Sequence, residues 1–362
     1  MRIGIYARGL TEKSGGVKVY INELTNSLIK ILPKNDALFV FHNSDKKVFN
    51  KKSNVHEILL KSKSKLYADF IEAPRLINQN NLDVILFPKN VIPYRIKAKK
   101  LVTIHDLAYY MPKYNAYTLL DTIYMKFMIK SSCKRADKII SVSENTKKDI
   151  INILNINPDK IEVVHEGVDS KFKIIKDKEK LDNIKKKYNL SNNFIFYAGS
   201  ISPRKNIKRL ISAFQSIQEK TNLDLVITGN KLWKNQQEMQ MIKQNPRIKV
   251  LGFIPEEDLP ALYNLAKIYI YPSLYEGFGL PILEAQACGC PIISSNASSL
   301  PEVAGKHGAL FVNPQSEKEI AQSIENVFNN PKLKSQLIKA GFDNVKSFEW
   351  SNSAVRTMKV LR

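Results

Sequence analysis

Short, continuous apolar runs recur along the whole chain, and segments with helical spacing lie between many of them. In the first half the runs are RIGIYA, ALFVFH, LDVILFP, KLVTIHD, KIISVSE and KIEVVHEG. In the second half they are NFIFYAGS, LDLVITG, IKVLGF, KIYIYPS, CPIISSN and GALFVN. Strands that are apolar at nearly every position are typical of parallel sheets covered on both faces. The sequence therefore predicts an α/β protein.

The strand–helix design occurs twice, which predicts two Rossmann-like domains. A length of 362 residues suits two domains, each able to bury its own core. The Lys-rich, apolar-poor stretch near 169–190 is the expected boundary. In open α/β sheets ligands bind beyond the carboxyl ends of the strands, so the loops that follow the strands are the places to look for function.

The formal net charge of +22 indicates an acidic partner. Such an excess attracts phosphate, whether in nucleic acid, in anionic lipid or in a nucleotide. A genome-wide bias toward Lys, Asn and Ile can produce part of it. A bilayer fits the remainder better than DNA, because no zinc-finger, helix-turn-helix or RNA-binding signature occurs. No apolar run reaches about 18 residues, and MRIGIYARGL lacks the features of a signal peptide, so a cytoplasmic location is expected.

Metal binding and disulfide bonds are not expected. The three cysteines, Cys133, Cys288 and Cys290, are too few and odd in number for a disulfide framework. No D-x-D and no cluster of His, Asp or Glu with metal-ligand spacing occurs. Any bound diphosphate would therefore need protein cations in place of a metal.

Arg204 and Lys205 are the best-placed cations. They lie in SISPRKN, between the run NFIFYAG and a segment with helical spacing. A helix N-terminus already favours an anion, and a guanidinium and an ammonium added there predict a diphosphate site. The alternative is two solvated surface cations in a Lys-rich protein.

The segment YEGFGLPILE follows the run KIYIYPS and carries Glu276 and Glu284. Gly277 and Gly279 allow the backbone to approach a ligand closely, and a helix is expected to start near Gly279 or Leu280. A carboxylate there can accept hydrogen bonds from hydroxyl groups. The alternative is a charge at a helix N-terminus for one glutamate and a solvated face for the other.

Two further strand-end features are weaker. TIHDL places His105 at the end of a strand, where a functional histidine and a structurally satisfied one are about equally expected. Gly15 and Gly16 precede a helix, but they match neither G-x-G-x-x-G nor a Walker loop. A plain glycine turn explains that pair as well as phosphate contact does.

Taken together these segments resemble family 4 retaining glycosyltransferases, which have the two-domain GT-B fold with sheets facing across a cleft. The resemblance covers nearly the whole chain in the same order. It rests on SGGVKVY, TIHDL, SVSEN, HEGVD, YAGSISPRKN, GFIPEEDLPALY and YPSLYEGFGLPILEAQACGCPIISSNASSLPEVAG. The TIHDL form followed by AYYMPKY is most similar to bacterial mannosyltransferases that build surface polysaccharides. One departure is His165–Glu166 before Gly167, where the family frequently has Asn.

The resemblance implies a role for each matching residue. Glu276 would contact the donor sugar, Glu284 the nucleotide ribose, and His105 would approach the sugar. The loop at 252–254 would read the base. The implied catalytic residues are His105, Glu276, Arg204 and Lys205. The implied donor-binding residues are Gly15, Gly16, Arg204, Lys205, Phe253, Ile254, Glu276, Gly277, Phe278, Gly279, Leu280 and Glu284.

The implied reaction moves a hexose from a nucleoside diphosphate sugar to a glycan or lipid-linked glycan. The first candidate for the hexose is mannose, with GDP-mannose as the donor. Residues 1–170, joined by a C-terminal helix at 345–362, would bind the acceptor, and residues 171–344 the donor. No metal or cofactor is implied, and the location would be cytoplasmic or peripheral on the inner face of the membrane. Two alternatives stay open: another GT-B sugar-nucleotide enzyme such as an epimerase, and a non-catalytic partner subunit.

Overall fold

The computed structural model describes residues 1–11, 15–44, 48–49, 52–62, 64–114, 117–229 and 236–362. Ser14 of the motif SGGVKVY lies outside these ranges. The chain divides into two compact units, the first made of 1–110, 119–167 and 349–362, and the second of 111–118 and 168–348. From the sequence, the chain is expected to pass from the first domain to the second between residues 170 and 171, and to return between residues 344 and 345.

The first unit is built on a parallel sheet of seven strands in the order β3-β2-β1-β4-β5-β6-β7. Its strands are β1 (Arg2–Tyr6), β2 (Ala37–His42), β3 (Val55–Leu59), β4 (Val84–Phe87), β5 (Lys99–Ile104), β6 (Lys138–Ser141) and β7 (Ile161–Val163). Its longer helices are α1 (Gly16–Ile31), α3 (Ala73–Gln79), α4 (Leu119–Arg135), α5 (Glu144–Leu154) and α14 (Trp350–Leu361). Its shorter ones are η1 (Arg8–Thr11), α2 (Lys65–Tyr67), the π-helix η2 (Ala68–Glu72), η3 (Ala108–Tyr110) and η5 (Pro158–Lys160).

The second unit repeats the design with six parallel strands in the order β10-β9-β8-β11-β12-β13. They are β8 (Phe194–Ala198), β9 (Asp224–Thr228), β10 (Ile248–Gly252), β11 (Ile268–Tyr271), β12 (Ile292–Ser295) and β13 (Leu310–Val312). Its helices are η4 (Pro112–Tyr114), α6 (Lys178–Lys187), η6 (Pro203–Lys205), α7 (Ile207–Thr221), α8 (Gln236–Lys243), α9 (Leu259–Leu265), α10 (Leu280–Ala287), α11 (Leu300–Ala304), α12 (Glu317–Asn329) and α13 (Pro331–Val345).

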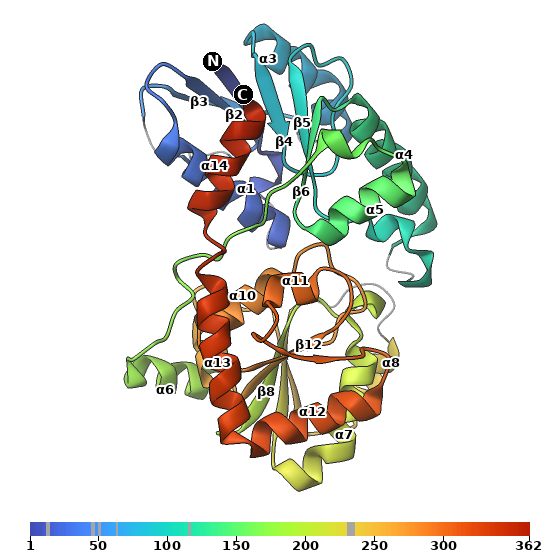
Figure 1. The fold of residues 1–362 in the computed structure, drawn as a ribbon, viewed down its shortest axis with the longest axis vertical. Coiled ribbons are helices and arrows are strands. Elements are labelled where there is room, and N and C mark those ends of the chain that lie inside the picture. The colour runs from blue at the N-terminus through green and yellow to red at the C-terminus, as the bar shows by residue number, and fades with distance from the viewer. Residues whose placement is uncertain (12–14, 45–47, 50–51, 63, 115–116, 230–235) are drawn as a thin grey trace. The chain divides into compact units, whose positions relative to one another are not determined.

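Both sheets have the buried central strands that are expected of parallel sheets covered on both faces. The central strands β4, β8 and β11 are buried at every position, and Figure 1 shows helices flanking each sheet. The predicted α/β class with two parallel sheets is confirmed. The residues of the edge strand β3 are half-buried or exposed, and they include polar side chains. The strand therefore has no continuous apolar run, and the sequence did not reveal it.

The chain termini meet within the first unit. The last helix, α14, packs along α1, and the guanidinium of Arg362 lies 2.9 Å from the carboxylate of Asp36. The N-terminal ammonium of Met1 lies 2.6 Å from the other oxygen of that carboxylate. The C-terminal helix therefore completes the first unit although it follows the second along the chain.

Candidate active site

The turn after β8 carries Arg204 and Lys205. It is a short 3-10 helix, η6, that ends at Lys205 and is followed by Asn206, whose φ of 62° is left-handed. The Asn206 amide donates to the carbonyls of Pro272 and Pro314 at 3.0 and 2.6 Å, which ties the turn to neighbouring strand ends. Helix α7 then begins at Ile207. The two cations are thus fixed at the carboxyl edge of the second sheet, where ligands of α/β proteins bind.

Glu276 pairs with both cations. Its Oε1 lies 2.5 Å from the ammonium of Lys205, and its Oε2 lies 2.8 Å from the guanidinium of Arg204. The same guanidinium donates to the carbonyl oxygen of Tyr275 at 2.6 Å. The structure therefore brings three of the predicted site residues into one cluster.

Glu276 is ionised at neutral pH despite its burial. Burial by itself raises the pKa of this carboxyl, but the charges of Arg204 and Lys205 outweigh it and lower the pKa to about 2. Two cations and one carboxylate leave one net positive charge in the cluster. That balance suits an anionic ligand at the end of the sheet.

Tyr271 is a member of this cluster that the sequence reasoning missed. Its hydroxyl accepts from the Lys205 ammonium at 2.7 Å and donates to Oε1 of Glu276 at 3.1 Å. The ammonium also lies 4.9 Å from the centre of the Tyr271 ring. The period-two spacing of Tyr269 and Tyr271 in KIYIY could have indicated that both rings point to one face of the strand.

The loop from Glu276 to Gly279 is held by serine hydroxyls. Ser299 donates to the carbonyls of Glu276 and Phe278 at 3.0 and 2.7 Å, and Ser298 accepts from the backbone N–H of Glu276 at 2.9 Å. Gly279 precedes α10 with a φ of 120°, and a Cβ there would lie 2.8 Å from a methyl carbon of Leu300. Only glycine fits this position without strain.

Glu284 lies one turn inside α10 and belongs to a different set of partners. The hydroxyl of Tyr263, on α9, donates to its Oε2 at 2.8 Å. Burial raises the pKa of Glu284 to about 7, while this hydrogen bond and the charge of Lys171 act in the other direction. The carboxyl therefore changes its charge close to neutral pH.

A row of three tyrosine rings connects the two glutamates. The ring centres of Tyr263 and Tyr269 are 5.1 Å apart, and those of Tyr269 and Tyr271 are 5.9 Å apart. The outer rings donate their hydroxyls to Glu284 and Glu276 respectively. The two carboxylates therefore lie at opposite ends of one rigid aromatic row and do not form an acid–base pair.

Phe253 and Ile254 follow β10 at the same edge. Gly252 has a φ of 70°, and its carbonyl accepts from the backbone N–H of Gly229 at 2.8 Å and from the hydroxyl of Thr228 at 2.9 Å. These bonds tie the ends of β9 and β10 together. The Phe253 side chain is 55% exposed, whereas Ile254 is buried. An exposed ring beside a fixed backbone is suited to a flat ligand.

His105 lies in the first unit, at the end of β5. Its Nδ1 is 3.2 Å from Oε1 of Glu166, and its Nε2 is 2.8 Å from the carbonyl oxygen of Pro88. The Tyr20 ring packs edge-on against the imidazole, with ring centres 4.7 Å apart. Both ring nitrogens face acceptors, so the fully hydrogen-bonded form is the imidazolium.

The pKa of His105 is accordingly raised. Burial lowers it, but the hydrogen bond and charge of Glu166, with smaller effects of Pro88 and Asp106, reverse the shift. In the sequence Glu166 stands out only as a departure from the family pattern. The two residues are 61 positions apart, and only the fold shows that they form a pair.

Gly15 and Gly16 also belong to the first unit. Gly15 has a φ of 135° and open space around it, and α1 begins at Gly16. The carbonyl of Gly15 accepts the N–H groups of Lys18 and Val19. Gly15, Gly16 and His105 thus lie in one unit, and the remaining predicted site residues lie in the other.

Two family models match the chain. One, described as glycosyltransferase family 4, matches residues 14–172, and the other, described as glycosyl transferases group 1, matches residues 177–343. The O-antigen chain mannosyltransferase B of Escherichia coli is 31% identical over 282 residues, which cover 76% of this chain and 73% of the relative. The chain belongs to glycosyltransferase family 4.

The other comparisons agree with this family. The serotype-specific mannosyltransferase WbdA of Escherichia coli is 30% identical over 281 residues, or 75% of this chain and 34% of the relative, so the chain spans about a third of that longer protein. The crystal structure of Anabaena Alr3699/HepE in complex with UDP-glucose matches 100% of this chain and 99% of that chain, with a TM-score of 0.77 at 16% identity. The predicted GT-B fold and glycosyltransferase class are confirmed.

The described part of this glycosyltransferase contains no group of three or more His, Cys, Asp or Glu residues that could hold a metal ion. Burial raises the pKa of the Cys288 thiol to about 12, so this thiol is protonated at neutral pH.

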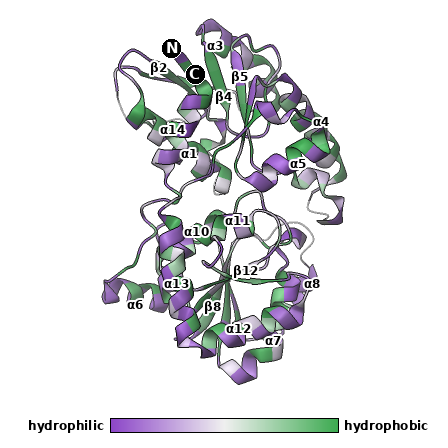
Figure 2. Ribbon diagram, viewed as in Figure 1, coloured by the Kyte–Doolittle hydropathy of each residue, from purple (hydrophilic) through white to green (hydrophobic). Residues whose placement is uncertain are grey.

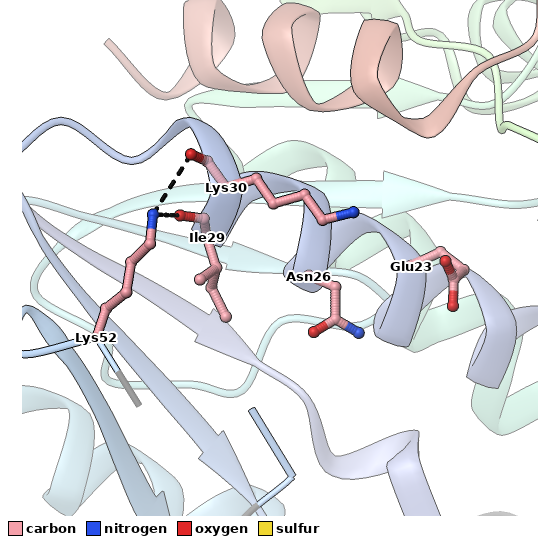
Figure 3. Close-up of a pocket in the computed structure, with 5 residues that line it drawn as sticks. All are labelled: Glu23, Asn26, Ile29, Lys30 and Lys52. Carbon is pink, nitrogen blue, oxygen red and sulfur yellow. Dashed lines mark hydrogen bonds between the residues drawn. The ribbon is translucent and has the colours of Figure 1, made fainter. Parts of the chain in front are cut away.

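A separate pocket in the first unit has a structural explanation. It is lined by Glu23, Asn26, Ile29, Lys30 and Lys52 (Figure 3). The ammonium of Lys52 donates to the carbonyl of Ile29 at 2.7 Å and approaches that of Lys30 at 3.4 Å. Lys52 therefore satisfies carbonyls at the C-terminal end of α1, where a cation is favourable.

Proposed function

We propose that this glycosyltransferase transfers a mannosyl residue from a nucleoside diphosphate mannose, GDP-mannose in the first place, to a glycan or lipid-linked glycan acceptor of surface polysaccharide synthesis. The observation that carries the proposal is the buried cluster of Arg204, Lys205 and Glu276 at the carboxyl edge of the second sheet. The name of the relative from Escherichia coli, an O-antigen chain mannosyltransferase, supports the sugar and the pathway class.

The donor would lie at the carboxyl edge of the second sheet, reaching from Glu276 to Glu284. Arg204 and Lys205 would hold the diphosphate, with backbone N–H groups from Gly277 to Leu280 adding contacts. Glu276 would contact sugar hydroxyls, and Glu284 would accept hydrogen bonds from the ribose. Phe253 and Ile254 would lie against the base. These assignments are the ones that the family resemblance implies, and the place of the side chains at the strand ends is compatible with them.

The chemistry required is departure of a diphosphate. As the bond between C1 of the sugar and the phosphate oxygen breaks, negative charge develops on the leaving group, and the fixed cations of Arg204 and Lys205 stabilise it. The acceptor hydroxyl attacks C1 from the same face, and the departing phosphate oxygen takes its proton, so the configuration is retained. This step requires no protein nucleophile.

Both ring nitrogens of His105 already face acceptors, Glu166 and the carbonyl of Pro88, so its imidazolium would be held in an ion pair with Glu166. It is therefore not the general base in this mechanism. Gly15 and Gly16 would add backbone contacts from the first unit. The protein cations would replace a metal ion, so a chelator such as EDTA is expected to leave turnover unchanged.

We place the reaction at the inner face of the cell membrane, where a lipid-linked acceptor would be presented. The net charge of +22 supports contact with anionic lipid. The alternatives, an epimerase-like enzyme or a non-catalytic subunit, have no observation in their favour.

The test is release of nucleoside diphosphate by the purified protein from GDP-mannose, GDP-glucose, UDP-glucose and UDP-N-acetylglucosamine. Release is expected to be fastest from GDP-mannose, and NMR of the product should show the anomeric configuration of the donor. An epimerase would instead convert the donor without releasing diphosphate. Absence of release from every donor in the presence of acceptor glycans would overturn the proposal.

A further inference from the structure

One face of α4 exposes large apolar side chains to solvent, and we call it the α4 face. Leu120 is 81% exposed and Phe127 64% exposed. The face consists of Leu119, Leu120, Ile123, Tyr124 and Phe127. Steps of three and four residues place these positions on one side of a helix. Figure 2 shows apolar residues along α4.

A second exposed apolar segment adjoins this helix. It contains Leu66, Tyr67 and Ile71, on α2 and η2. The segment and the helix are linked by Tyr94, whose ring stacks on Phe70 at 6.2 Å and whose hydroxyl lies 3.0 Å from that of Ser131 on α4. Eight of the fifteen large apolar side chains that are exposed in the described part of the chain lie on these two segments. Such a concentration marks an interaction surface.

Lysines continue the α4 face toward the C-terminal end of the helix. Lys130 and Lys134 are exposed and follow Phe127 by three and seven residues, so they lie on the same side. Lys126 lies over the Tyr110 ring at 5.5 Å. The face thus changes from apolar to cationic along one helix. An apolar stretch next to lysines suits an anionic bilayer, where the apolar side chains can enter the boundary of the acyl chains and the ammonium groups can meet phosphates.

We propose that the α4 face, together with Leu66, Tyr67 and Ile71, docks this enzyme on an anionic lipid bilayer. The apolar side chains enter the boundary between headgroups and acyl chains, and Lys130 and Lys134 contact lipid phosphates. The binding is interfacial. In the part of the chain that the structure describes, no helix is long and apolar enough to cross a membrane.

The charge pattern favours a bilayer over a protein partner. Lysines beside an exposed apolar face match a surface with apolar depth and a phosphate layer above it, and the whole chain is strongly basic. The inference deepens the proposed function, because it names the surface that would bring the enzyme to a lipid-linked acceptor. It is tested without donor or acceptor, so its outcome is independent of transfer activity.

The experiment is co-sedimentation of the full chain with vesicles of phosphatidylcholine alone and of phosphatidylcholine with phosphatidylglycerol. The parent is expected to bind the anionic vesicles at least tenfold more tightly than the neutral ones. The triple variant Leu120→Ser/Ile123→Ser/Phe127→Ser and the double variant Lys130→Glu/Lys134→Glu should each lose at least tenfold in partitioning. Unfolding midpoints measured beside them establish that the variants are folded.

Matched controls are Ile174→Ser/Val355→Ser, which removes exposed apolar side chains elsewhere, and Lys318→Glu/Lys332→Glu, which makes the same charge change on α12 and α13. Both should bind as the parent does. Equal binding by the parent and the α4 variants would overturn the proposal, as would equal loss in the controls. Binding of the parent to neutral and anionic vesicles with the same affinity would also overturn it.

Discussion

The ammonium of Lys205 lies 2.5 Å from Oε1 of Glu276, and each side chain is only about one-tenth exposed. Arg204 occupies the second oxygen of the same carboxylate. One anion thus fixes two cations at the edge where β8 and β11 end. Preorganised charges of this kind stabilise a transition state without the cost of reorienting them during the reaction.

Replacement of Lys205 by alanine is expected to lower kcat/KM for donor turnover by about 100-fold or more. The variant loses one of the two charges that face the leaving diphosphate, and loss of one such donor typically costs two to three orders of magnitude. The measurement is initial-rate kinetics with the preferred donor. Lys208→Ala is the control. Lys208 lies nearby on α7, and its hydrogen-bond partner among the described residues is Gln237, which is not a site residue. Parent-like kinetics in Lys205→Ala would contradict the role.

Replacement of Tyr271 by phenylalanine should lower the free energy of unfolding by about 1.5–3 kcal/mol, the range for hydrogen bonds to charged groups. The ring remains, but Lys205 and Glu276 lose the hydroxyl between them. Urea denaturation measures the change. Tyr269→Phe is the matched control, because the partners of its hydroxyl on the described chain are uncharged: the carbonyl of Ala198, at a long 3.4 Å, and the hydroxyl of Tyr263. Equal losses of unfolding free energy in the two variants would show that the hydrogen bonds of Tyr271 to Lys205 and Glu276 do not stabilise the fold.

Glu284 makes stability and donor binding depend on pH in opposite ways. Burial raises its pKa to about 7 from 4.5, so the folded protein holds this proton more strongly than the unfolded chain. Its ionisation therefore destabilises the fold progressively as pH rises from about 4.5 to 7. Glu284→Gln should remove that slope and raise the free energy of unfolding at pH 8 by about 3 kcal/mol.

Donor affinity should change in the other direction. A carboxylate accepts hydrogen bonds from two ribose hydroxyls better than a carboxylic acid does, so the KM for donor should fall as pH rises through 7. In Glu284→Gln the KM should be higher and independent of pH over this range. A pH-dependent KM that persists in the variant would assign the titration to another group.

The strand-end rule is enough to predict from the sequence where the cations and both glutamates lie, because parallel strands bring their carboxyl ends to one edge. It does not predict which side chains meet there. In the sequence Tyr271 is an ordinary strand residue, and its contact with Lys205 depends on the register of β8 against β11. The strand β3 was missed because an edge strand that is half exposed carries no continuous apolar run.

His105 illustrates the same limit in the first unit. Its place at a strand end is predictable, but its partner Glu166 follows β7, two strands away in the order β5-β6-β7. A contact across a sheet between residues 61 positions apart has no local sequence signal. The sequence therefore carries no sign that both ring nitrogens of His105 face acceptors.

Glu166→Gln should lower the pKa of His105. Burial acts to lower that pKa in the parent, and the hydrogen bond and charge of Glu166 reverse the shift. The stabilisation from this pair is present below the unfolded pKa of about 6.5 and is lost as pH rises through the higher folded value. The variant should therefore lose more stability at pH 6 than at pH 9. NMR titration of the imidazole measures the shift, and an unchanged pKa would exclude the pairing.

Gly279→Ala tests whether the start of α10 must keep its conformation. At φ 120° an alanine is strained, and its Cβ would lie 2.8 Å from the Leu300 side chain, so the turn between Glu276 and Leu280 has to shift. We expect a loss of about 2 kcal/mol or more in stability, and a fall in kcat/KM for donor that exceeds the loss of folded protein. Gly252→Ala is the matched control for stability alone, because its φ of 70° is also left-handed but no atom lies within 4 Å of the added Cβ, whereas its loop is expected to contact the base. It should lose only about 1 kcal/mol, the cost of the backbone conformation itself. If both variants lose the same stability, or if Gly279→Ala keeps the kcat/KM of the parent, the close contact with Leu300 does not shape the site.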